Sequence, residues 1–526
     1  MMKKIRDILL DPFGENLAIL LVVSLLSSLA DFVFWISYGD VVFAVYMALH
    51  GVIMAYAIVL LLGLLKGVLF RLCLVVVLCL GVVNLCIDVG VHTIMHFGFT
   101  SDLVAVFLGT NGTETREFLE MYVNGRMVIV VVLLLLFIGL IYWFVRNKLS
   151  AGYKIVKICG FLIVVAGAIV IFGRKSANWS GVFLMKIYTI VKYEPTPNLR
   201  DYCKTHSLNV ATTPNEVVLI IGESLNKEFM SLYGYQRKTT PRLDSLRKSS
   251  NLLVFDNIKS SGIGTVPAFK YMMTSLRQSD TANAWLASDF LLDIINDAGY
   301  HTMWISNQAE SGVHDNVVAR FAALADSTYF CGTRYMGPAK RDLDEVVLQP
   351  VKNRVEERLS QAKFTVIHLS GNHEKFSERY PERFAVFSSS DYLEYPEYQR
   401  KTRSEYDNSV LYNDLVVSNI IDYYKNSEAV VFYFPDHSLD IYHSDDRYAG
   451  HARPTVPVSV AAGTNIPFIV YMTDRYKERF PEIANRISRS INKNMETEDV
   501  MYSILDVAGV SFEKSDAVKA FSLFSL

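Results

Sequence analysis

The sequence has little cysteine, no strong excess of either charge and no repeats. Six of its 526 residues are cysteine, and outside the long apolar runs there are two, Cys203 and Cys331, which allow one disulfide. The formal net charge of −2 and the lack of a basic run argue against a nucleic-acid partner. No internal repeat or low-complexity tract stands out, and we expect a monomer. The other four cysteines are expected to be packing residues in the apolar runs: Cys73, Cys79, Cys86 and Cys159.

Apolar residues are concentrated in the first third of the chain. Hydrophobic residues make up 51% of the sequence, and its mean hydropathy is positive, which is unusual for a wholly soluble protein. From about Asn198 onward, polar and apolar residues mix as they do in a globular domain. Before that point, five runs approach the ~20 residues that cross ~30 Å of hydrocarbon as a helix: 17–36, 41–65, 68–89, 127–145 and 155–172.

Basic residues indicate how these five spans are oriented. They precede the first span, separate the second from the third, and separate the fourth from the fifth, which places these three segments on the cytoplasmic side. Five crossings then put the rest of the chain outside the cytoplasm, and the opposing pair Arg174 and Lys175 is outweighed. The residues concerned are Lys3, Lys4, Arg6, Lys66, Arg71, Arg146, Lys148 and Lys154.

These patterns divide the chain into three parts. Residues 1–175 are expected to form a five-span transmembrane domain with an outward loop at 91–126. Residues 176–210 are expected to form an interfacial bridging helix and a linker, because an amphipathic aromatic segment precedes Pro195 and Pro197. Residues 211–526 are expected to form a catalytic α/β domain outside the cytoplasm.

Short β-rich runs alternate with helical patterns in this last part. The expected strands are 217–221, 301–305, 364–369, 429–434 and 467–472. The expected helices are 243–248, 289–298, 346–362, 404–426 and 497–508. This alternation predicts a largely parallel central sheet whose ligands lie beyond the carboxyl ends of the strands.

Three of the expected strand ends carry side chains that can bind a metal. Glu223 follows the first strand, His373 follows the third, and Asp436 and His437 follow the fourth. Oxygen and imidazole ligands without thiolate suit zinc or manganese. Each element alone could be a helix cap or a loop residue, but the coincidence of three strand ends favours a metal site.

A threonine offers a group for such a metal to activate. Thr265 follows a run of small residues at 260–264 and precedes an apolar, helix-like segment at 268–276. A hydroxyl at a helix N-terminus beside a divalent cation can ionise, and the first amides of the helix can hold phosphate oxygens. The alternative is an ordinary helix N-cap, and the local sequence does not decide between the two.

The order of these motifs resembles that of the phosphoethanolamine transferases. These are bacterial inner-membrane enzymes with five spans and a periplasmic domain of the alkaline phosphatase and sulfatase superfamily. The resemblance covers essentially the whole chain. The motifs that carry it are Ile221-Gly222-Glu223-Ser224, residues 237–241, Thr265 in its glycine loop, Gly371-Asn372-His373, Tyr406-Asp407-Asn408, Asp436-His437 and Gly450-His451.

The resemblance implies a role for particular residues. Four match the family's catalytic zinc ligands: Glu223, Thr265, Asp436 and His437. Thr265 also matches the nucleophile that carries phosphoethanolamine as a covalent intermediate. Two more, His373 and His451, match histidines that contact the phosphoryl group or a second zinc, and Thr110 and Glu114 match the donor headgroup site.

The resemblance also implies cofactor, substrates and place. One or two Zn²⁺ ions are expected, with Mn²⁺ as the alternative, and phosphatidylethanolamine is the expected donor, taken from membrane lipid. The acceptor is expected to be lipopolysaccharide, at its core or lipid A, or another periplasmic glycan. The protein is then a multi-pass protein of the bacterial inner membrane with its catalytic domain in the periplasm.

Some residues depart from the family's polymyxin-resistance members. Those carry a DHGES-type sequence and several disulfides, whereas this chain has Asp436-His437-Ser438-Leu439-Asp440. Val106 replaces their asparagine, and the segment after Asn307 lacks their phosphate-binding lysine, for which His314 is the candidate substitute. These departures favour a branch that modifies core sugars or other periplasmic glycans.

Other functions compete with this interpretation. A phosphoglycerol transferase or a membrane-anchored phosphodiesterase would keep the chemistry and change the donor, whereas a sulfatase activity is disfavoured because residues 265–269 do not supply a Cys-x-Pro-x-Arg type sequence. A non-enzymatic transporter or sensor would use intramembrane ionisable residues such as Asp88, His92 and His96. Polar residues at a helix end are usually solvated, so we expect that of these three.

Overall fold

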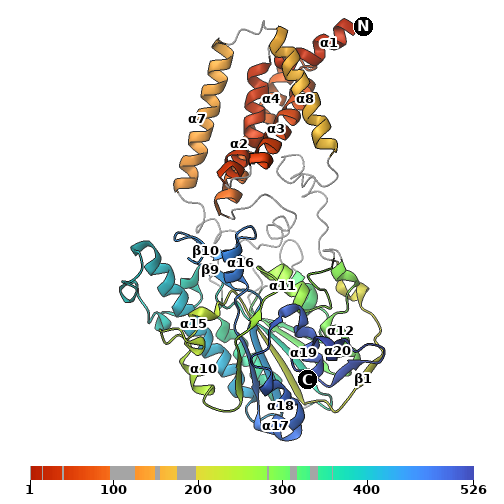
Figure 1. Ribbon diagram of the computed structural model, residues 1–526. Coiled ribbons are helices and arrows are strands. Elements are labelled where there is room, and N and C mark those ends of the chain that lie inside the picture. Colours follow the sequence, from red (N-terminus) through yellow and green to blue (C-terminus); the bar gives the residue numbers. More distant parts are fainter. Residues whose placement is uncertain are drawn as a thin grey trace. The chain divides into compact units, whose positions relative to one another are not determined.

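The computed structural model separates into two compact units, Met1–Tyr193 and Glu194–Leu526 (Figure 1). The residues that it describes are 2–14, 16–37, 41–94, 125–148, 154–173, 197–280, 284–308, 317–331, 342–357 and 359–525. Most of the expected outward loop, including Thr110 and Glu114, lies outside these residues. The expected bridging helix and His314 also lie outside them, so the three-part division stays a prediction.

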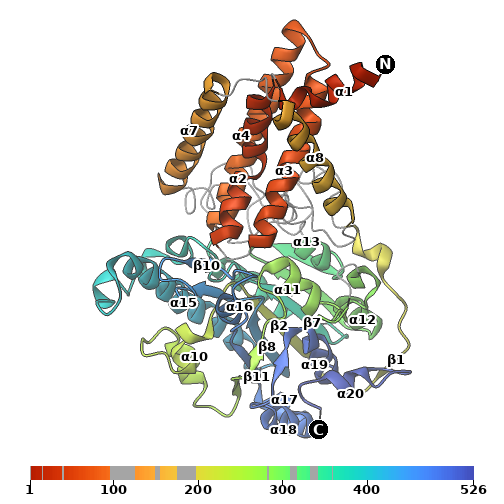
Figure 2. The same cartoon turned by 45° about the horizontal axis from the view of Figure 1, so that its top comes forward.

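The N-terminal unit is helical (Figure 2). After α1 (Met2–Leu10), its described α-helices are α2 (Leu17–Ser37), α3 (Val41–Leu62), α4 (Gly67–Ile94), α7 (Gly125–Lys148) and α8 (Lys154–Gly173). The described parts of α2, α3, α4 and α7 are long and apolar enough to cross a membrane by length and composition. A helix satisfies its own backbone hydrogen bonds, as the bilayer interior requires, so the chain is a membrane protein. Helix α8 occupies the fifth expected position and contains a shorter apolar stretch, Lys157–Gly167, so a fifth crossing stays a prediction.

Helix α2 packs closely against both α3 and α4. A Cβ atom placed on Gly51 of α3 would lie 2.3 Å from the Ser28 hydroxyl of α2, and one on Gly81 of α4 would lie 3.0 Å from the Leu26 side chain. Small residues at such crossings let two helix backbones approach each other, which is how membrane helices gain packing contacts. Gly81 therefore lets α2 come within reach of polar side chains on α4.

The C-terminal unit is built on a seven-stranded sheet in the order β3-β11-β8-β2-β7-β5-β6. From one edge, the strands are β3 (Leu252–Phe255), β11 (Phe468–Met472), β8 (Ala429–Pro435), β2 (Glu216–Gly222), β7 (Lys363–His368), β5 (His301–Ser306) and β6 (Ser327–Phe330). Neighbouring strands from β8 to β6 pair in parallel, and β11 runs antiparallel to both β3 and β8. The predicted α/β fold with a largely parallel sheet is confirmed, and β3 and β6 are additions to the strands expected from sequence.

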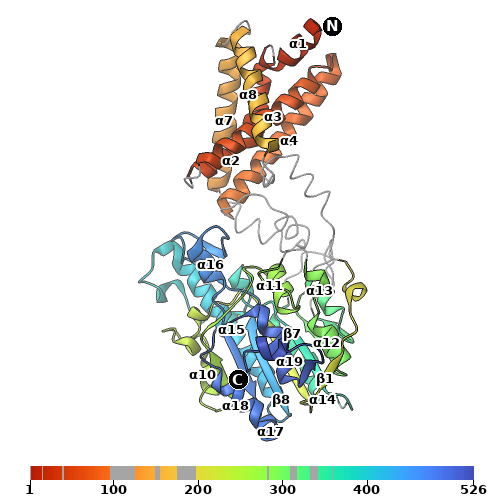
Figure 3. The ribbon, with the colours of Figure 1, turned by 45° about the vertical axis from the view of Figure 1, so that its right-hand side comes forward.

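Helices cover both faces of this sheet (Figure 3). Side chains alternate along β2, so Val217, Leu219 and Ile221 pack in one buried cluster and Val218 and Ile220 pack in the other. The first face is covered by α11 (Thr265–Met272), α12 (Leu291–Asp297), α13 (Val317–Ala322), α18 (Pro481–Arg489) and α19 (Val500–Val507). The second is covered by α10 (Pro241–Leu246), α14 (Leu348–Glu356) and α15 (Glu397–Tyr424). Strand β2 is consequently buried along its whole length, as parallel strands between two helical layers are.

A small hairpin follows β8, which lies beside the central strand β2. Strand β9 (Leu439–Ile441) pairs antiparallel with β10 (Ala449–His451), and His451 lies opposite Leu439. This pairing keeps the chain that follows β8 at the carboxyl edge of the sheet. It therefore places His451 beside the residues that follow β8.

Candidate active site and metal centre

Glu223 is the first residue after β2, and the backbone around it is tightly packed. Ser224 follows with φ 57°, in the left-handed region that turns the chain sharply. Gly371, from the loop after β7, also has positive φ, and a Cβ there would lie 2.6 Å from the Glu223 nitrogen, so this approach requires glycine. The Ser224 hydroxyl donates to Glu223 Oε1 at 2.7 Å, and Asn372 N donates to the Glu223 carbonyl at 2.9 Å. The first contact fixes the carboxylate, and the second fixes the backbone that carries it.

Asp436 and His437 come directly after β8 and are fully buried. The Asp436 amide donates to the Gly222 carbonyl at 3.2 Å, which aligns the two strand ends. Nδ1 of His437 lies 2.9 Å from the Ser438 carbonyl, which favours a proton on Nδ1 and leaves Nε2 to face the carboxylates. That Nε2 atom lies 3.2 Å from Glu223 Oε1 and 3.6 Å from Asp436 Oδ2.

Thr265 begins α11 beside this cluster. Its hydroxyl donates to Glu223 Oε2 at 3.4 Å, and its side chain is half-buried rather than enclosed. Gly262 lets the preceding loop turn tightly, because a Cβ there would lie 2.5 Å from the Ala268 nitrogen. The structure thus brings Thr265 to the three candidate ligands, at the carboxyl edge of the sheet.

The residues present fit a divalent metal ion. Glu223, Asp436 and His437 each offer a ligand atom, and these atoms lie within 4.8 Å of one another. Asp436 Oδ2 and His437 Nε2 are buried and have no hydrogen-bond partner within the described part of the chain, although such atoms are normally paired. Two carboxylates and one imidazole suit zinc or manganese.

The pKa values of these three residues also indicate that the cluster favours a bound positive charge. Burial and the charge of Glu223 raise the pKa of Asp436 to about 7. Burial lowers the pKa of His437, but the carboxylates of Asp436 and Glu223 outweigh it and raise that pKa to about 10. Burial likewise raises the pKa of Glu223, and the charge of the His437 imidazole, 3.2 Å away, overcomes it and holds that pKa below its usual value. The two carboxylates stabilise a cation between them.

Two further histidines stand next to the cluster. The ring of His451 lies 5.0 Å from that of His437 and 5.8 Å from that of His373. Burial lowers the pKa of His373 to about 4, so this imidazole is neutral near pH 7 and can accept a proton. Arg379 donates from Nε to the His373 carbonyl at 3.0 Å, which holds the loop. The structure therefore assembles all six residues that the sequence points to in this unit.

Residues that the motifs do not include support this arrangement. Asp344 accepts hydrogen bonds from the amides of Ser370 and Gly371, each at 2.8 Å, and so orders the loop that carries His373. Glu374 Oε1 lies 2.9 Å from His451 Nδ1. Glu374 follows an expected strand and Asp344 precedes an expected helix, but neither has a local sequence pattern that distinguishes a supporting carboxylate from a surface one.

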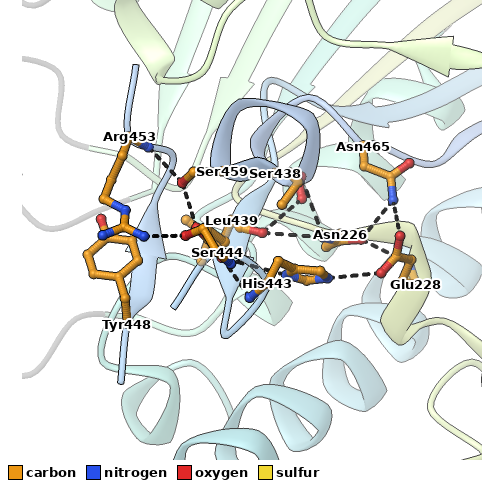
Figure 4. Close-up of polar contacts among 12 residues, drawn as sticks. Asn226, Glu228, Ser438, Leu439, His443, Ser444, Tyr448, Arg453, Ser459 and Asn465 are labelled. Atoms are coloured by element: carbon orange, nitrogen blue, oxygen red, sulfur yellow. Dashed lines mark hydrogen bonds and ion pairs between the residues drawn. The ribbon is translucent and has the colours of Figure 1, made fainter. Parts of the chain in front are cut away.

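The segment that departs from the resemblance, Ser438 to Asp440, anchors the β9–β10 hairpin. Asp440 is fully buried and accepts from the His443 amide at 2.9 Å and the Ser459 hydroxyl at 2.5 Å. Figure 4 shows His443 reaching Glu228, at 2.9 Å, and Ser444 next to Arg453. Asp440 thus positions the hairpin that bears His451.

Sequence and structure comparisons identify relatives of this chain. Residues 215–510 match the sulfatase family profile. Phosphoethanolamine transferase EptC of Escherichia coli (strain K12) is 28% identical over 313 residues, which are 58% of this chain and 53% of that one. The Kdo(2)-lipid A phosphoethanolamine 7''-transferase of the same organism is 24% identical over 266 residues, 50% of this chain and 45% of that one. The chain spans about half the length of the curated relatives it matches.

Solved structures extend the likeness to the fold. The C-terminal periplasmic domain of EptC from Escherichia coli, in complex with Zn, is 27% identical with a TM-score of 0.56 over 61% of this chain and 89% of that one. The integral membrane protein EptA from Neisseria meningitidis, a lipooligosaccharide phosphoethanolamine transferase, has a TM-score of 0.67 over 96% of this chain and 98% of that one, at 18% identity. The resemblance stated from the motifs is confirmed. Because the matched profile covers more than half of the 526 residues, the chain belongs to the sulfatase family.

Proposed function

We propose that this protein transfers phosphoethanolamine from phosphatidylethanolamine to a periplasm-facing glycan or glycolipid, such as lipopolysaccharide. The observation that carries the proposal is the position of Thr265. Its half-buried hydroxyl donates a hydrogen bond to Glu223, one of three residues that could bind a metal at the edge of the sheet in a sulfatase-family domain. The names of the two Escherichia coli relatives support the transferred group. The apolar helices of the N-terminal unit support a lipid donor, and the bacterial inner membrane with a periplasmic catalytic domain is the proposed location.

Glu223, Asp436, His437 and Thr265 would hold one zinc ion, with His373 and His451 as candidate ligands of a second. When bound, zinc supplies Lewis-acid chemistry, which lowers the pKa of a nearby hydroxyl and offsets charge on phosphoryl oxygens. A homologous domain solved in complex with Zn supports this choice of metal, with manganese as the alternative.

The chain's own residues account for the two transfer steps. In the first, Thr265 Oγ forms a bond to the donor phosphorus, and the bond from phosphorus to the diacylglycerol oxygen breaks. His373 or His451 takes the proton from Thr265 Oγ and gives it to the leaving diacylglycerol oxygen, so no proton is gained or lost in this step. Phosphoethanolamine is then carried by Thr265.

The second step reverses the roles. The acceptor hydroxyl attacks the phosphorus on Thr265 while the same histidine takes its proton and passes it to Thr265 Oγ as the bond from phosphorus to that oxygen breaks, which restores the free hydroxyl. Because the phosphoryl group is stored between two substrates, the kinetics are expected to be ping-pong. Because burial lowers its pKa to about 4, the His373 imidazole is neutral near pH 7 and has a ring nitrogen free to take the proton in this step.

The test is capture of the covalent intermediate on the full-length protein. We expect incubation with headgroup-labelled phosphatidylethanolamine in mixed micelles, without acceptor, to add one phosphoethanolamine mass that peptide mass spectrometry places on Thr265. Thr265→Ala should lose the adduct and lower turnover by at least about 10³-fold, as removal of a nucleophile does.

The matched control is Thr274→Ala, which changes a threonine just beyond the other end of α11. The Thr274 hydroxyl donates to the Lys270 carbonyl at 2.6 Å, so its loss should leave the adduct on Thr265 in place. Turnover without any adduct on Thr265 would contradict the mechanism. Labelling from phosphatidylglycerol instead of phosphatidylethanolamine would make the protein a phosphoglycerol transferase, and release of free headgroup alone would make it a phosphodiesterase.

A further inference from the structure

Three ionisable residues of the N-terminal unit are buried together. Asp31 of α2 is 2% exposed, and Asp88 and His92 of α4 are 3% and 7% exposed. Each offers a ligand atom within 4.8 Å of the other two, and His92 Nε2 lies 2.5 Å from Asp31 Oδ1. The expectation that Asp88 and His92 are solvated at a helix end was wrong, because α2 packs over them. His96 lies outside the described residues.

One atom of this cluster lacks a partner among the described residues and points to a bound ligand. Asp31 Oδ2 is buried and has no hydrogen-bond partner in the part of the chain that the structure describes. An unpaired carboxylate oxygen in an apolar, membrane-spanning unit is strongly disfavoured. A bound group that needs oxygen ligands would satisfy it.

The surroundings hold the cluster in a fixed geometry. The Asn84 amide donates to Asp88 Oδ2 at 2.8 Å and to the Leu26 carbonyl at 3.3 Å, which links α4 to α2. The Phe34 ring stacks on the His92 imidazole at a centroid distance of 4.1 Å and an angle of 12°. Supports of this kind orient the side chains that bind a metal.

We propose that Asp31, Asp88 and His92 bind a divalent metal cation within the N-terminal unit, in addition to the one at Glu223. Two carboxylates and one imidazole are a donor set that zinc or manganese accepts. Two ligands of one zinc lie roughly 3 Å apart or more, so binding replaces the hydrogen bond between Asp31 and His92 by coordination. The cation joins α2 to α4 and stabilises this end of the helical unit.

Metal content of the full-length protein tests the site. The chain is purified in detergent, equilibrated with zinc, freed of unbound metal and analysed by mass spectrometry for zinc per protein. Glu223→Gln and His437→Gln, combined with His373→Gln and His451→Gln, remove both candidate zinc positions of the C-terminal unit, and this variant should retain about one equivalent. Adding Asp31→Asn and His92→Gln should remove it.

A matched variant and a second measurement guard against misfolding. His50→Gln changes another buried histidine, in α3 and outside the cluster, and should leave the zinc content unchanged. For the unsubstituted protein, anomalous diffraction at the zinc edge should show a peak between Asp31 and His92. Absence of that peak from zinc-equilibrated crystals, or zinc content that does not depend on Asp31 and His92 in correctly folded variants, would overturn the proposal. Neither readout uses transferase activity, so failure here leaves the proposed reaction standing.

Discussion

Glu374 adjoins the candidate centre and lies directly after His373 in the chain. It is 7% exposed, and its Oε1 lies 2.9 Å from Nδ1 of His451. Arg379 donates to the Glu374 carbonyl from Nη2 at 2.6 Å, which fixes the backbone on which the carboxylate stands. A carboxylate on Nδ1 holds an imidazole in one orientation and one tautomer, with Nε2 left for proton transfer. Glu374 is therefore a positioning residue for His451.

Glu374→Gln should lower kcat by about 10- to 100-fold and change KM little, because an outer partner of a site histidine acts on its orientation and basicity. Steady-state transfer from labelled phosphatidylethanolamine measures both constants. The matched control is Glu378→Gln, which changes an acid in the same loop that pairs with Lys375 at 3.4 Å and is 43% exposed. Equal kinetic effects of the two substitutions would contradict the assignment.

At the scale of the elements, apolar runs predicted the strands well and the helix limits less well. The expected strand 217–221 is β2 (Glu216–Gly222), because both of its faces are buried and it reads as a continuous apolar run. Strand β6 (Ser327–Phe330) was missed because it is a half-exposed edge. Helix α15 begins at Glu397 rather than at 404, since its first turns are polar and carry no apolar periodicity.

The residues of the candidate site that follow strands were predictable from the sequence, whereas those placed by packing were not. Glu223, Asp436 and His437 stand at strand ends that local apolar runs reveal. The Asp31–His92 contact joins two helices 61 residues apart, and Glu374 joins His451 across 77 residues. Contacts of this range depend on packing, which a single sequence does not display.

Helix α15 also carries a carboxyl group whose burial makes stability depend on pH. Asp407 is fully buried, accepts from the Tyr235 hydroxyl at 2.9 Å and from the Tyr392 hydroxyl, and burial raises its pKa to about 7. The folded chain therefore keeps this proton up to about pH 7, whereas the unfolded chain loses it near pH 4. The folded state binds more protons than the unfolded state in this window. The contribution of Asp407 to the free energy of unfolding is therefore complete below about pH 4 and falls as pH rises towards 7.

Asp407→Asn, which has no proton to lose, should make the Tm of the full-length protein fall less between pH 5 and pH 7.5 than that of the unsubstituted chain. Part of the slope should remain, because burial also raises the pKa of Asp414 on the same helix to about 7. Thermal unfolding in one detergent across this pH range measures the effect. Asp422→Asn, at a carboxylate of α15 that is 61% exposed, should leave the slope unchanged. An unaltered slope in Asp407→Asn would refute the prediction.

For the whole molecule, the two units are stabilised by different means. The N-terminal unit presents apolar side chains outward along α4 and α7, as lipid-facing helices do. The C-terminal unit buries an apolar cluster on each face of its sheet. A core of that extent needs no covalent links to stay folded, in contrast to the several disulfides of the polymyxin-resistance members that the sequence resembles.

All six cysteines are free thiols, which leads to a prediction for a domain proposed to be in an oxidising compartment. Burial and nearby carboxylates raise the pKa of Cys203 to about 12 and that of Cys331 to about 11, so neither thiol forms much thiolate, the species that reacts to form disulfides. Alkylation of the unfolded full-length protein without reductant should label all six cysteines, as should alkylation after reduction, and mass spectrometry counts the labels. Two labels fewer without reductant would show a disulfide, and its position would identify Cys203 and Cys331 as partners. With six labels, reductant should leave Tm unchanged, because the core rather than a covalent link then holds the C-terminal unit together.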